Sequence, residues 1–365
     1  MKTRVVLLFG GQSAEHEVSC VSARHVAAAM DPSRYVVIPV GITKDGDWVL
    51  PELSMQVIAG GALELPNEAF VAEGARLDMF GGLGRHSSTP VAGAYGLRAP
   101  TLACDVVFPV LHGPFGEDGT VQGFLEMAGV PYVGSGVLGS AVGMDKQMMK
   151  LAFTAAGLPG PRHVVFRRSG WTAHREAALS TANLLGYPVF TKPANLGSSV
   201  GISRCTSEAA MVAGIDLAFR YDSKVIVEEA IEGREIECAV LGNEDPKASV
   251  CGEIIPGREF YDYEAKYLEP SSKTLVPADL PETVSETIRS YAVSAFRAVN
   301  AAGLARVDFF YDEANDRVMI NEINTMPGFT EISMFPKLWA ASGIGYSELI
   351  DRLIELALER AAQKQ

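Results

Sequence analysis

The first forty-two residues contain the feature that most restricts the fold of this chain. Residues 4–9 (RVVLLF) are apolar enough for a buried strand, two glycines follow as a turn, and a helix is expected up to Met30. A second apolar strand is expected at residues 35–42 (YVVIPVGI). Two strands joined by a helix form a βαβ unit, which opens a parallel sheet. The predicted fold class is therefore α/β.

Further elements divide the chain into three predicted domains, at residues 1–134, 135–228 and 229–365. Residues 51–104, which are rich in Gly, Ala and Pro, are expected to elaborate the first domain. The other expected elements are a strand at 105–113 with a helix ending at Gly129, short strands at 163–166, 187–193, 200–205 and 224–231, strands at 234–242 and 250–256, a helix at about 282–300, a hairpin at 304–324 and a closing helix at 346–360.

Composition excludes several classes of protein. The net charge of -13 argues against a general surface for nucleic acid or anionic membrane, so any anionic substrate must meet a few local cations. The five cysteines form no CxxC pair and no zinc-like cluster, which favours reduced, buried thiols. The N-terminal apolar run is too short for a signal peptide, and no run reaches the roughly 18 apolar residues of a spanning helix. A soluble cytoplasmic protein is expected.

Residues 191–204 (TKPANLGSSVGISR) match two well-known motifs only superficially. The G-x-S-x-G pattern at 197–201 suggests a hydrolase, but that site needs a helix after the serine and a later histidine. Here Val200–Ile202 is expected to be a strand, and all six histidines precede Ser199. The P-loop motif is absent. The G-x-G-x-x-G match at 134–139 lacks the acidic residue expected about 20 positions later in a dinucleotide site.

A β-hairpin with a Gly/Ser tip remains as the interpretation of this stretch. The backbone N–H groups of Gly197, Ser198 and Ser199 can form an anion-binding nest, to which Lys192 would add charge. The alternative is a plain hairpin turn, and the stretch alone does not decide between them.

The hairpin at 304–324 gathers possible metal ligands. Arg306 and Asp308 share one face of the first strand, and Glu322 and Asn324 share one face of the second. If the turn is centred near Ala314, both pairs lie on the same face, although a shift of one residue would separate them. Carboxylate and amide oxygens suit Mg²⁺, whereas a solvated outer face is the alternative.

The chain resembles the ATP-grasp D-alanine:D-alanine ligases over nearly its whole length. The matching stretches are LLFGGQSAEHEVS, FPVLHGPFGEDGTVQG, PYVGSGVLGSAVGMDK, KPANLGSSVGIS, IVEEAIEGREIE, REFYDYEAKY, ARVDFF and INEINTMPGFTEISMFP. The resemblance implies three α/β domains, with nucleotide held between the central and C-terminal domains. It also implies ATP-dependent joining of two D-alanines through an acyl phosphate, giving ADP, phosphate and a dipeptide for peptidoglycan synthesis.

The resemblance implies the nucleotide and metal ligands. Lys146 and Lys192 would hold the α and β phosphates, under a lid that carries Ser198 and Ser199. The remaining ATP-binding residues would be Glu228, whose side chain would frame adenine, Glu229 and Ile231 at its polar edge, Glu235 on the ribose, Asn321 and Glu322. Asp308, Glu322 and Asn324 would hold two Mg²⁺ ions, with Mn²⁺ as a substitute and K⁺ as a further candidate ion.

The substrate residues are implied in the same way. Glu15 would orient the ammonium group of the first D-alanine beside His112, and would also bond Ser198, which meets Tyr267. Lys266 would reach the transferred phosphate. The remaining assignments are Arg306 and the N–H of Gly328 for the oxyanion, and Ser333 with the backbone of Met334 for the carboxylate of the second substrate. Each of three residues has a purely structural alternative: Glu15 could start a helix, His112 could be a loop histidine, and Tyr267 could be a core tyrosine.

Acceptor choice and assembly complete the expectations. Tyr267, in a long polar loop of the kind that forms mobile lids, favours an amine acceptor. The alternative is a D-alanine:D-serine or D-alanine:D-lactate ligase on the same scaffold, and Glu331 departs from the small polar residue expected near the acceptor. An intact Arg306, Asp308, Glu322 and Asn324 set argues against an ATP-binding regulator without catalysis. The resemblance implies a homodimer.

Overall fold

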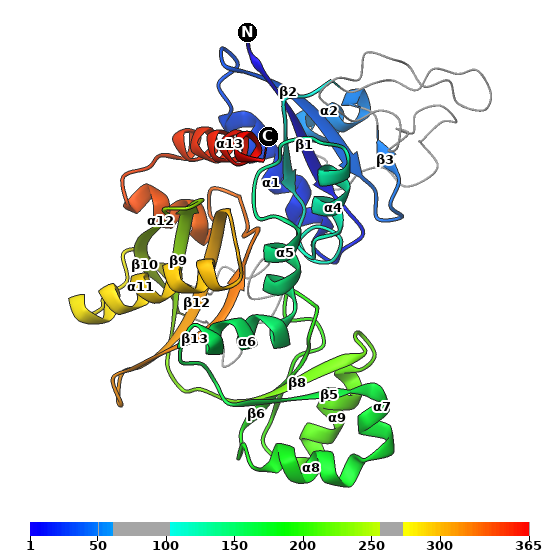
Figure 1. Cartoon of the computed structure of the whole chain (residues 1–365), viewed down its shortest axis with the longest axis vertical. Helices are drawn as coiled ribbons and strands as arrows, with labels where there is room; N and C mark the ends of the chain where they lie inside the picture. The colour runs from blue at the N-terminus through cyan, green and yellow to red at the C-terminus, as the bar shows by residue number, and fades with distance from the viewer. Residues whose placement is uncertain (50, 61–102, 256–272, 365) are drawn as a thin grey trace, which may run out of the picture.

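A computed structural model of the chain describes residues 1–49, 51–60, 103–255 and 273–364, and these residues contain three β-sheets (Figure 1). The expected elaboration at 51–104 falls mainly outside the described residues, apart from a helix, α2 (Pro51–Gly60). None of the described helices combines the length and apolar character that a membrane crossing requires.

The first sheet is the predicted parallel one, with a short antiparallel strand added at one edge. Its strands are β1 (Thr3–Gly10), β2 (Tyr35–Ile42), β3 (Trp48–Val49) and β4 (Val106–Val110), in the order β3-β2-β1-β4. Strand β1 runs parallel to both β2 and β4, and helix α1 (His16–Ala29) makes the crossover. Helix α4 (Thr120–Met127) follows β4 and buries Val121 and Leu125, as the spacing predicted. The βαβ prediction is confirmed.

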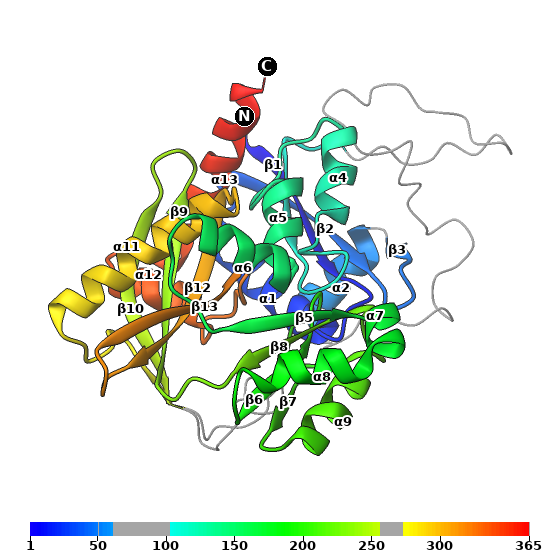
Figure 2. The same cartoon turned by 60° about the horizontal axis from the view of Figure 1, so that its bottom comes forward.

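The second sheet is small and antiparallel. It contains β5 (His163–Arg167), β6 (Val189–Pro193), β7 (Ser203–Cys205) and β8 (Lys224–Glu229), in the order β5-β8-β6-β7. Its helices are α7 (Arg168–Ala173), α8 (Arg175–Asn183) and α9 (Glu208–Ala218). Figures 1 and 2 show this unit set apart from the rest of the chain.

One strand of this unit is shorter than predicted. Residues 200–202 were expected to belong to a strand, but they lie in a turn and β7 begins at Ser203. The reason is local, because Ser198, Ser199 and Gly201 all have positive φ, which an extended strand does not allow. No helix follows Ser199, so the argument against a hydrolase still holds.

The third sheet carries helices on both faces. It contains β9 (Arg234–Gly242), β10 (Lys247–Ile255), β11 (Lys273–Leu275), β12 (Gly303–Asp312) and β13 (Arg317–Asn324), in the order β11-β10-β9-β12-β13. Helix α11 (Glu282–Ala298) covers the face that holds Cys238 and Val240, and α12 (Met334–Ala341) covers the face that holds Ala239 and Leu241. The alternation of these β9 residues is the period of two of a strand.

Helices α5 (Val137–Met144) and α6 (Lys146–Ala155) connect the first sheet to the second in sequence. Met149 and Phe153 of α6 nevertheless belong to the core between the third sheet and α11. Asp145 caps α6, because its side chain accepts hydrogen bonds from the N–H groups of Gln147 and Met148. The boundaries predicted at 134/135 and 228/229 remain predictions.

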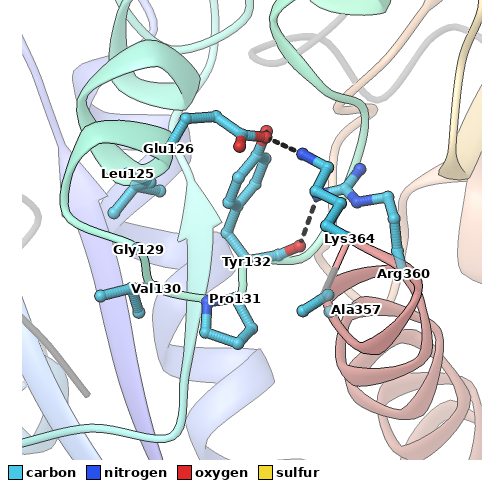
Figure 3. Close-up of a pocket in the computed structure, with 10 residues that line it drawn as sticks. Leu125, Glu126, Gly129, Val130, Pro131, Tyr132, Ala357, Arg360 and Lys364 are labelled. Atoms are coloured by element: carbon cyan, nitrogen blue, oxygen red, sulfur yellow. Dashed lines mark hydrogen bonds and ion pairs between the residues drawn. The ribbon is translucent and has the colours of Figure 1, made fainter. Parts of the chain in front are cut away.

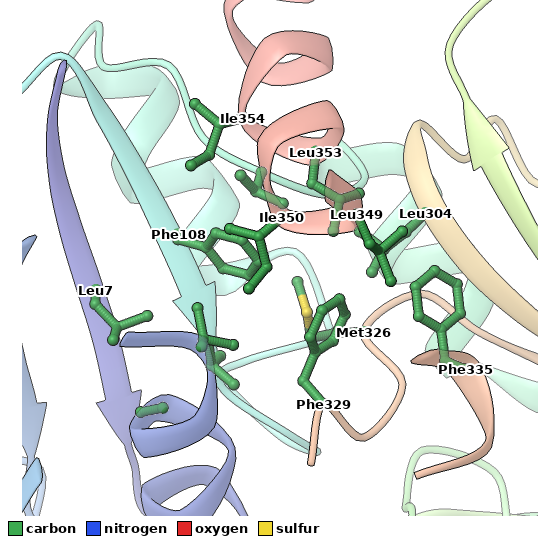
Figure 4. Close-up of a cluster of buried hydrophobic side chains, with 14 of the residues drawn as sticks. Leu7, Phe108, Leu304, Met326, Phe329, Phe335, Leu349, Ile350, Leu353 and Ile354 are labelled. Carbon is green, nitrogen blue, oxygen red and sulfur yellow. The ribbon is translucent and has the colours of Figure 1, made fainter. Parts of the chain in front are cut away.

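One hydrophobic core joins the first sheet to the C-terminal part of the chain (Figure 4). Leu7 and Phe108 come from β1 and β4, while Leu349 and Ile350 come from the closing helix α13 (Tyr346–Gln363). Phe329, from the loop between β13 and α12, meets the ring of Phe108 edge-on with centroids 5.8 Å apart. The loop after β13 is therefore packed against the sheet that begins the chain.

The end of α13 is attached to the first sheet by a charged side chain (Figure 3). Arg360 donates hydrogen bonds to the backbone oxygens of Tyr132 (3.0 Å) and Gly134, and its guanidinium lies 4.5 Å from the centroid of the Tyr132 ring. Lys364 pairs with Glu126 nearby, beside a cavity of about 220 Å³. These contacts fix α13 against the segment between α4 and α5, where Tyr132 pairs with Val107 of β4.

We expect Arg360→Ala to lower the free energy of unfolding by about 2–3 kcal/mol, because charged hydrogen bonds and a cation–π contact are lost together. The matched control is Arg352→Ala on the same helix, which removes an exposed pair with Glu348 and should cost at most about 0.5 kcal/mol. Guanidinium unfolding followed by circular dichroism measures both. Equal losses in the two variants would contradict the role of Arg360.

Candidate active site

A β-bulge determines which side chains face the site. Strand β12 pairs with β13 through Phe309 and Ile320 near the turn, but through Asp308 and Glu322 one step further on. Asn321 is the extra residue, and an extra residue reverses the facing of all residues beyond it. Asp308 stands opposite Glu322 and Arg306 opposite Asn324, so the two pairs share one face as predicted. The turn itself covers residues 313–316.

Arg306 holds the acidic groups of this face together. Its Nε and Nη2 donate to Oδ1 and Oδ2 of Asp308 at 2.7 and 2.6 Å, and Nε also lies 3.0 Å from Oε2 of Glu237. Asn324 donates to Asp308 at 3.0 Å. Burial opposes the charge of Arg306, but Asp308 and Glu237 outweigh it and hold the guanidinium pKa well above its usual range.

Three lysines face this hairpin from α6 and β6. The carboxylate of buried Glu228 takes Lys192 on Oε2 at 2.7 Å and Lys150 on Oε1 at 3.0 Å. Lys146, at the start of α6, donates to the backbone oxygen of Leu196 at 2.7 Å. The three ammonium groups are gathered at one place, which suits a polyphosphate.

Titration behaviour links the lysines to the hairpin. Burial alone would raise the Glu228 pKa, but Lys150 and Lys192 hold it well below its usual range. Burial lowers the pKa of Lys146, whereas Glu228 keeps the pKa of Lys192 raised despite burial. The charge of Glu322 favours the charged form of both Lys146 and Lys192, so its carboxylate lies near both.

The other predicted nucleotide residues lie around this cluster. Glu229 binds Arg162, with Oε2 2.7 Å from Nε, and its backbone N–H donates to the carbonyl of Arg162. Glu235 pairs with Phe310 of β12, and its charge acts on Lys192. Ile231 lies between the second and third sheets. The backbone oxygen of Asn321 accepts from Lys150 at 3.3 Å. The carboxylate of Glu228 is engaged by lysines, so its contact with adenine stays a prediction.

The glycine-serine tip lies against the start of α1. A Cβ added at Gly197 would stand 3.2 Å from Oε2 of Glu15, so only glycine allows this approach without displacement. Ser198 and Ser199 both have positive φ, and the Ser198 hydroxyl is buried without a hydrogen-bond partner among the described residues. A buried hydroxyl of this kind fits a site that a ligand completes.

Glu15 and His112 form a second pocket beside that tip. Glu15 is buried at 9% exposure before the first turn of α1, and its charge acts on His112. Nδ1 of His112 lies 3.0 Å from the backbone oxygen of Met326, whereas its buried Nε2 has no partner within the described ranges. Burial lowers the pKa of His112, which keeps the imidazole neutral.

The remaining predicted residues lie after β13 or outside the described residues. Ser333 precedes α12, and its Oγ accepts from the N–H of Thr330 at 3.1 Å. The same Oγ would stand 3.0 Å from a Cβ added at Gly328, so the two predicted residues are neighbours. Met334 begins α12 and is buried. Lys266 and Tyr267 lie outside the described residues.

Sequence reasoning did not identify Lys150, Glu237 or Glu117 as parts of this site. Lys150 comes four residues after Lys146 on one helix face, and Glu237 comes two residues after Glu235 on one strand face. These two spacings could have indicated Lys150 and Glu237. Glu117 accepts hydrogen bonds from the N–H groups of Gly113 and Met326.

The donor set fits a divalent cation only together with a ligand. No group of three His, Cys, Asp or Glu side chains is gathered for metal binding in the part of the chain that the structure describes. The candidate set has two carboxylates and one amide. Mg²⁺ commonly takes one or two carboxylates and completes its octahedron with water and substrate phosphates.

The small antiparallel sheet carries the glycine-serine tip, and the third sheet carries the carboxylate hairpin. The lysine cluster lies between them. This arrangement is the ATP-grasp fold predicted from the sequence. Residues 4–135 match the family model described as D-ala D-ala ligase N-terminus, and residues 152–355 match D-ala D-ala ligase C-terminus. The chain belongs to the D-alanine–D-alanine ligase family, as the sequence resemblance indicated.

Individual relatives agree over the full length. The chain is 49% identical over 364 residues to the D-alanine–D-alanine ligase of Natranaerobius thermophilus, covering 100% of this chain and 97% of the relative. The D-alanine–D-alanine ligase from Coxiella burnetii has a TM-score of 0.81 and 37% identity, with 100% and 96% of the two chains covered. The VanG D-Ala:D-Ser ligase from Enterococcus faecalis has a TM-score of 0.81 and 34% identity, with 98% and 100% covered.

Glu322→Gln should remove one of the two candidate metal carboxylates while leaving the pairing of the hairpin as it is. We expect the affinity for Mn²⁺ in the presence of ADP to fall at least about tenfold, since losing even an outer-shell partner of a metal has that effect. Electron paramagnetic resonance of free Mn²⁺ measures the affinity, and circular dichroism verifies folding. A folded Glu322→Gln variant with the parental affinity would exclude Glu322 as a metal ligand.

Proposed function

We propose that this protein joins two D-alanine molecules to D-alanyl-D-alanine, with hydrolysis of ATP to ADP and phosphate. The dipeptide would serve as a precursor of peptidoglycan. The observation that carries the proposal is the convergence of three parts. The lysine cluster around Glu228 and the Glu15–His112 pocket both adjoin the glycine-serine tip. The third part, the hairpin that carries Asp308, brings Glu322 near two of the lysines. They suit a polyphosphate, an amino acid and a divalent cation, respectively.

The nucleotide side of the site would act by charge and position. Lys146 and Lys192 would hold the α and β phosphates, with Ser198 and Ser199 closing over them and Glu235 on the ribose hydroxyls. Glu228, Glu229 and Ile231 would border the adenine, and Asn321 and Glu322 would complete the phosphate end. Asp308, Glu322 and Asn324 would hold two Mg²⁺ ions, which supply charge neutralisation of the phosphates when bound.

The substrate side would orient two amino acids for two successive steps. Glu15 would take the ammonium group of the first D-alanine. The carboxylate of that D-alanine would attack the γ-phosphorus of ATP to give an acyl phosphate, and ADP would leave. The amine of the second D-alanine, after losing a proton, would attack the acyl carbon, and phosphate would leave. Arg306 and the N–H of Gly328 would stabilise the oxyanion, while Ser333 and Met334 would hold the second carboxylate.

The choice of acceptor, the metal ions and the assembly are proposed from the resemblance to the ligase family. Tyr267 and Lys266 would close over the acyl phosphate and exclude water, and Tyr267 favours an amine acceptor. A D-alanine:D-serine ligase is the second candidate, because the VanG enzyme shares the fold. We propose Mg²⁺, with Mn²⁺ as a substitute and K⁺ as an additional ion. A homodimer in the cytoplasm, where ATP is available, is proposed on the same basis.

Product analysis tests the proposed function. The protein is incubated with ATP, Mg²⁺ and D-alanine, alone or with L-alanine, D-serine or D-lactate, and the products are identified by mass. We expect D-alanyl-D-alanine as the main product of every mixture that contains D-alanine, with one phosphate released per dipeptide. A main product containing D-serine or D-lactate would overturn the acceptor assignment and keep the ligase mechanism.

Lys192→Ala tests the nucleotide role. We expect ATP turnover to fall at least about 100-fold, because a charge aimed at the phosphates is removed from a site with little water. The fold should survive, since Lys150 still neutralises Glu228. Arg175→Ala, which removes an exposed cation of the same unit, is the control. Turnover close to the parental rate in a folded Lys192→Ala protein would exclude the assigned role.

A further inference from the structure

Glu117 connects two loops that belong to different sheets. Its Oε2 accepts a hydrogen bond of 2.7 Å from the N–H of Gly113, in the loop that follows β4. Its Oε1 accepts a hydrogen bond of 3.1 Å from the N–H of Met326, in the loop that follows β13. The two oxygens of one carboxylate therefore join two loops, and Glu117 and Met326 are 209 residues apart in the sequence.

The first of these loops forms the wall of the Glu15–His112 pocket. A Cβ added at Gly113 would stand 3.0 Å from Oε2 of Glu15, so Gly113 lies between the two carboxylates. His112 precedes Gly113, and its Nδ1 lies 3.0 Å from the backbone oxygen of Met326. The backbone of Met326 is thus held on both its N–H and its carbonyl by this one loop.

The second loop continues directly into the proposed acceptor corner. Gly328 lies two residues beyond Met326 and Ser333 lies seven residues beyond it. Met326 and Phe329 are buried in the core shared with β4. A displacement of the backbone at Met326 would therefore shift the N–H of Gly328 relative to Glu15.

We propose that Glu117 is a positioning residue that fixes the separation between the pocket for the first amino acid and the corner for the second. The inference rests on the proposed function, because it concerns the geometry of that reaction. The acyl carbon and the attacking nitrogen must approach to about 3–3.5 Å, and a misplacement of about 1 Å can reduce the rate about 100-fold.

Substrate binding strengthens this clamp. Burial and the charge of Glu15 raise the pKa of Glu117 to about 8, although the N–H groups of Gly113 and Met326 act in the opposite direction. An ammonium group bound at Glu15 offsets the repulsion between the two carboxylates. Glu117 is then favoured as an anion, and hydrogen bonds to an anion are the stronger ones.

Two variants of Glu117 separate its span from its charge. Glu117→Gln keeps the size but offers one acceptor oxygen, so one of the two N–H groups loses its partner. Glu117→Asp keeps the charge but is one methylene shorter, so it cannot reach both loops. Glu126→Gln on the neighbouring helix α4 is the control, because Glu126 pairs with Lys364 away from the site.

The reaction readout is the ratio of phosphate released to dipeptide formed, with D-alanine, ATP and Mg²⁺. In both Glu117 variants we expect this ratio to rise at least about twofold and the rate of dipeptide formation to fall about 10- to 100-fold, because a displaced acceptor loses the acyl phosphate to water. The KM for ATP should stay within about twofold. Phosphate and dipeptide falling in parallel, or a parental ratio in Glu117→Asp, would overturn the positioning role.

Amide hydrogen exchange tests the clamp without reference to activity. Exchange at whichever of Gly113 and Met326 loses its partner should rise at least about tenfold in Glu117→Gln, and exchange at both should stay unchanged in Glu126→Gln. Unchanged exchange in Glu117→Gln would overturn the clamp. If the parent protein forms no dipeptide, the proposed function fails, and the exchange result still decides whether Glu117 joins the two loops.

Discussion

The β-bulge at Asn321 decides the facing of every residue that follows it in β13. If the pairing ran on regularly without the bulge, Asn321 would stand opposite Asp308, and Glu322 would point to the face that holds Val307 and Phe309. That face is the core beneath α11, where an unpaired carboxylate would be costly. With the bulge, Ile320 and Ile323 both enter this core and Glu322 faces the site. Packing and function therefore select the same register.

Charge balance explains how a chain with a net charge of -13 can hold a polyphosphate. Cations are gathered at one place, with Lys146, Lys150 and Lys192 on one side and Arg306 on the other. Glu228 and Asp308 hold the cations in position. A nucleotide with its divalent cation would complete both clusters, which is why they face each other.

The sequence predicted the fold well because its signals are local. The apolar strands around Gly10 and Gly11, the helical spacing at Val121 and Leu125 and the closing helix all depend on neighbouring residues. The strand predicted at Val200–Ile202 was wrong, because positive φ angles at the Gly/Ser tip override β-branched preference. The hairpin register was predicted from a turn centred near Ala314, without the bulge. Residues on one face of a regular strand are separated by even numbers of positions. The two apolar residues Ile320 and Ile323 are three positions apart, and this spacing could have indicated the bulge.

Contacts between distant segments were beyond reach of the sequence. Glu117 meets Met326, and Lys150 meets Glu228, only because three sheets converge. The roles of Lys266 and Tyr267 remain predictions, because they lie outside the described residues.

The most direct measurement of the central claim is anomalous diffraction at the manganese edge from a crystal grown with ADP and Mn²⁺. The account predicts manganese beside Asp308, Glu322 and Asn324, on the face that Arg306 shares, with the phosphates between the metal and Lys192. Manganese bound elsewhere, or an ordered nucleotide that does not approach Lys146 and Lys192, would contradict it.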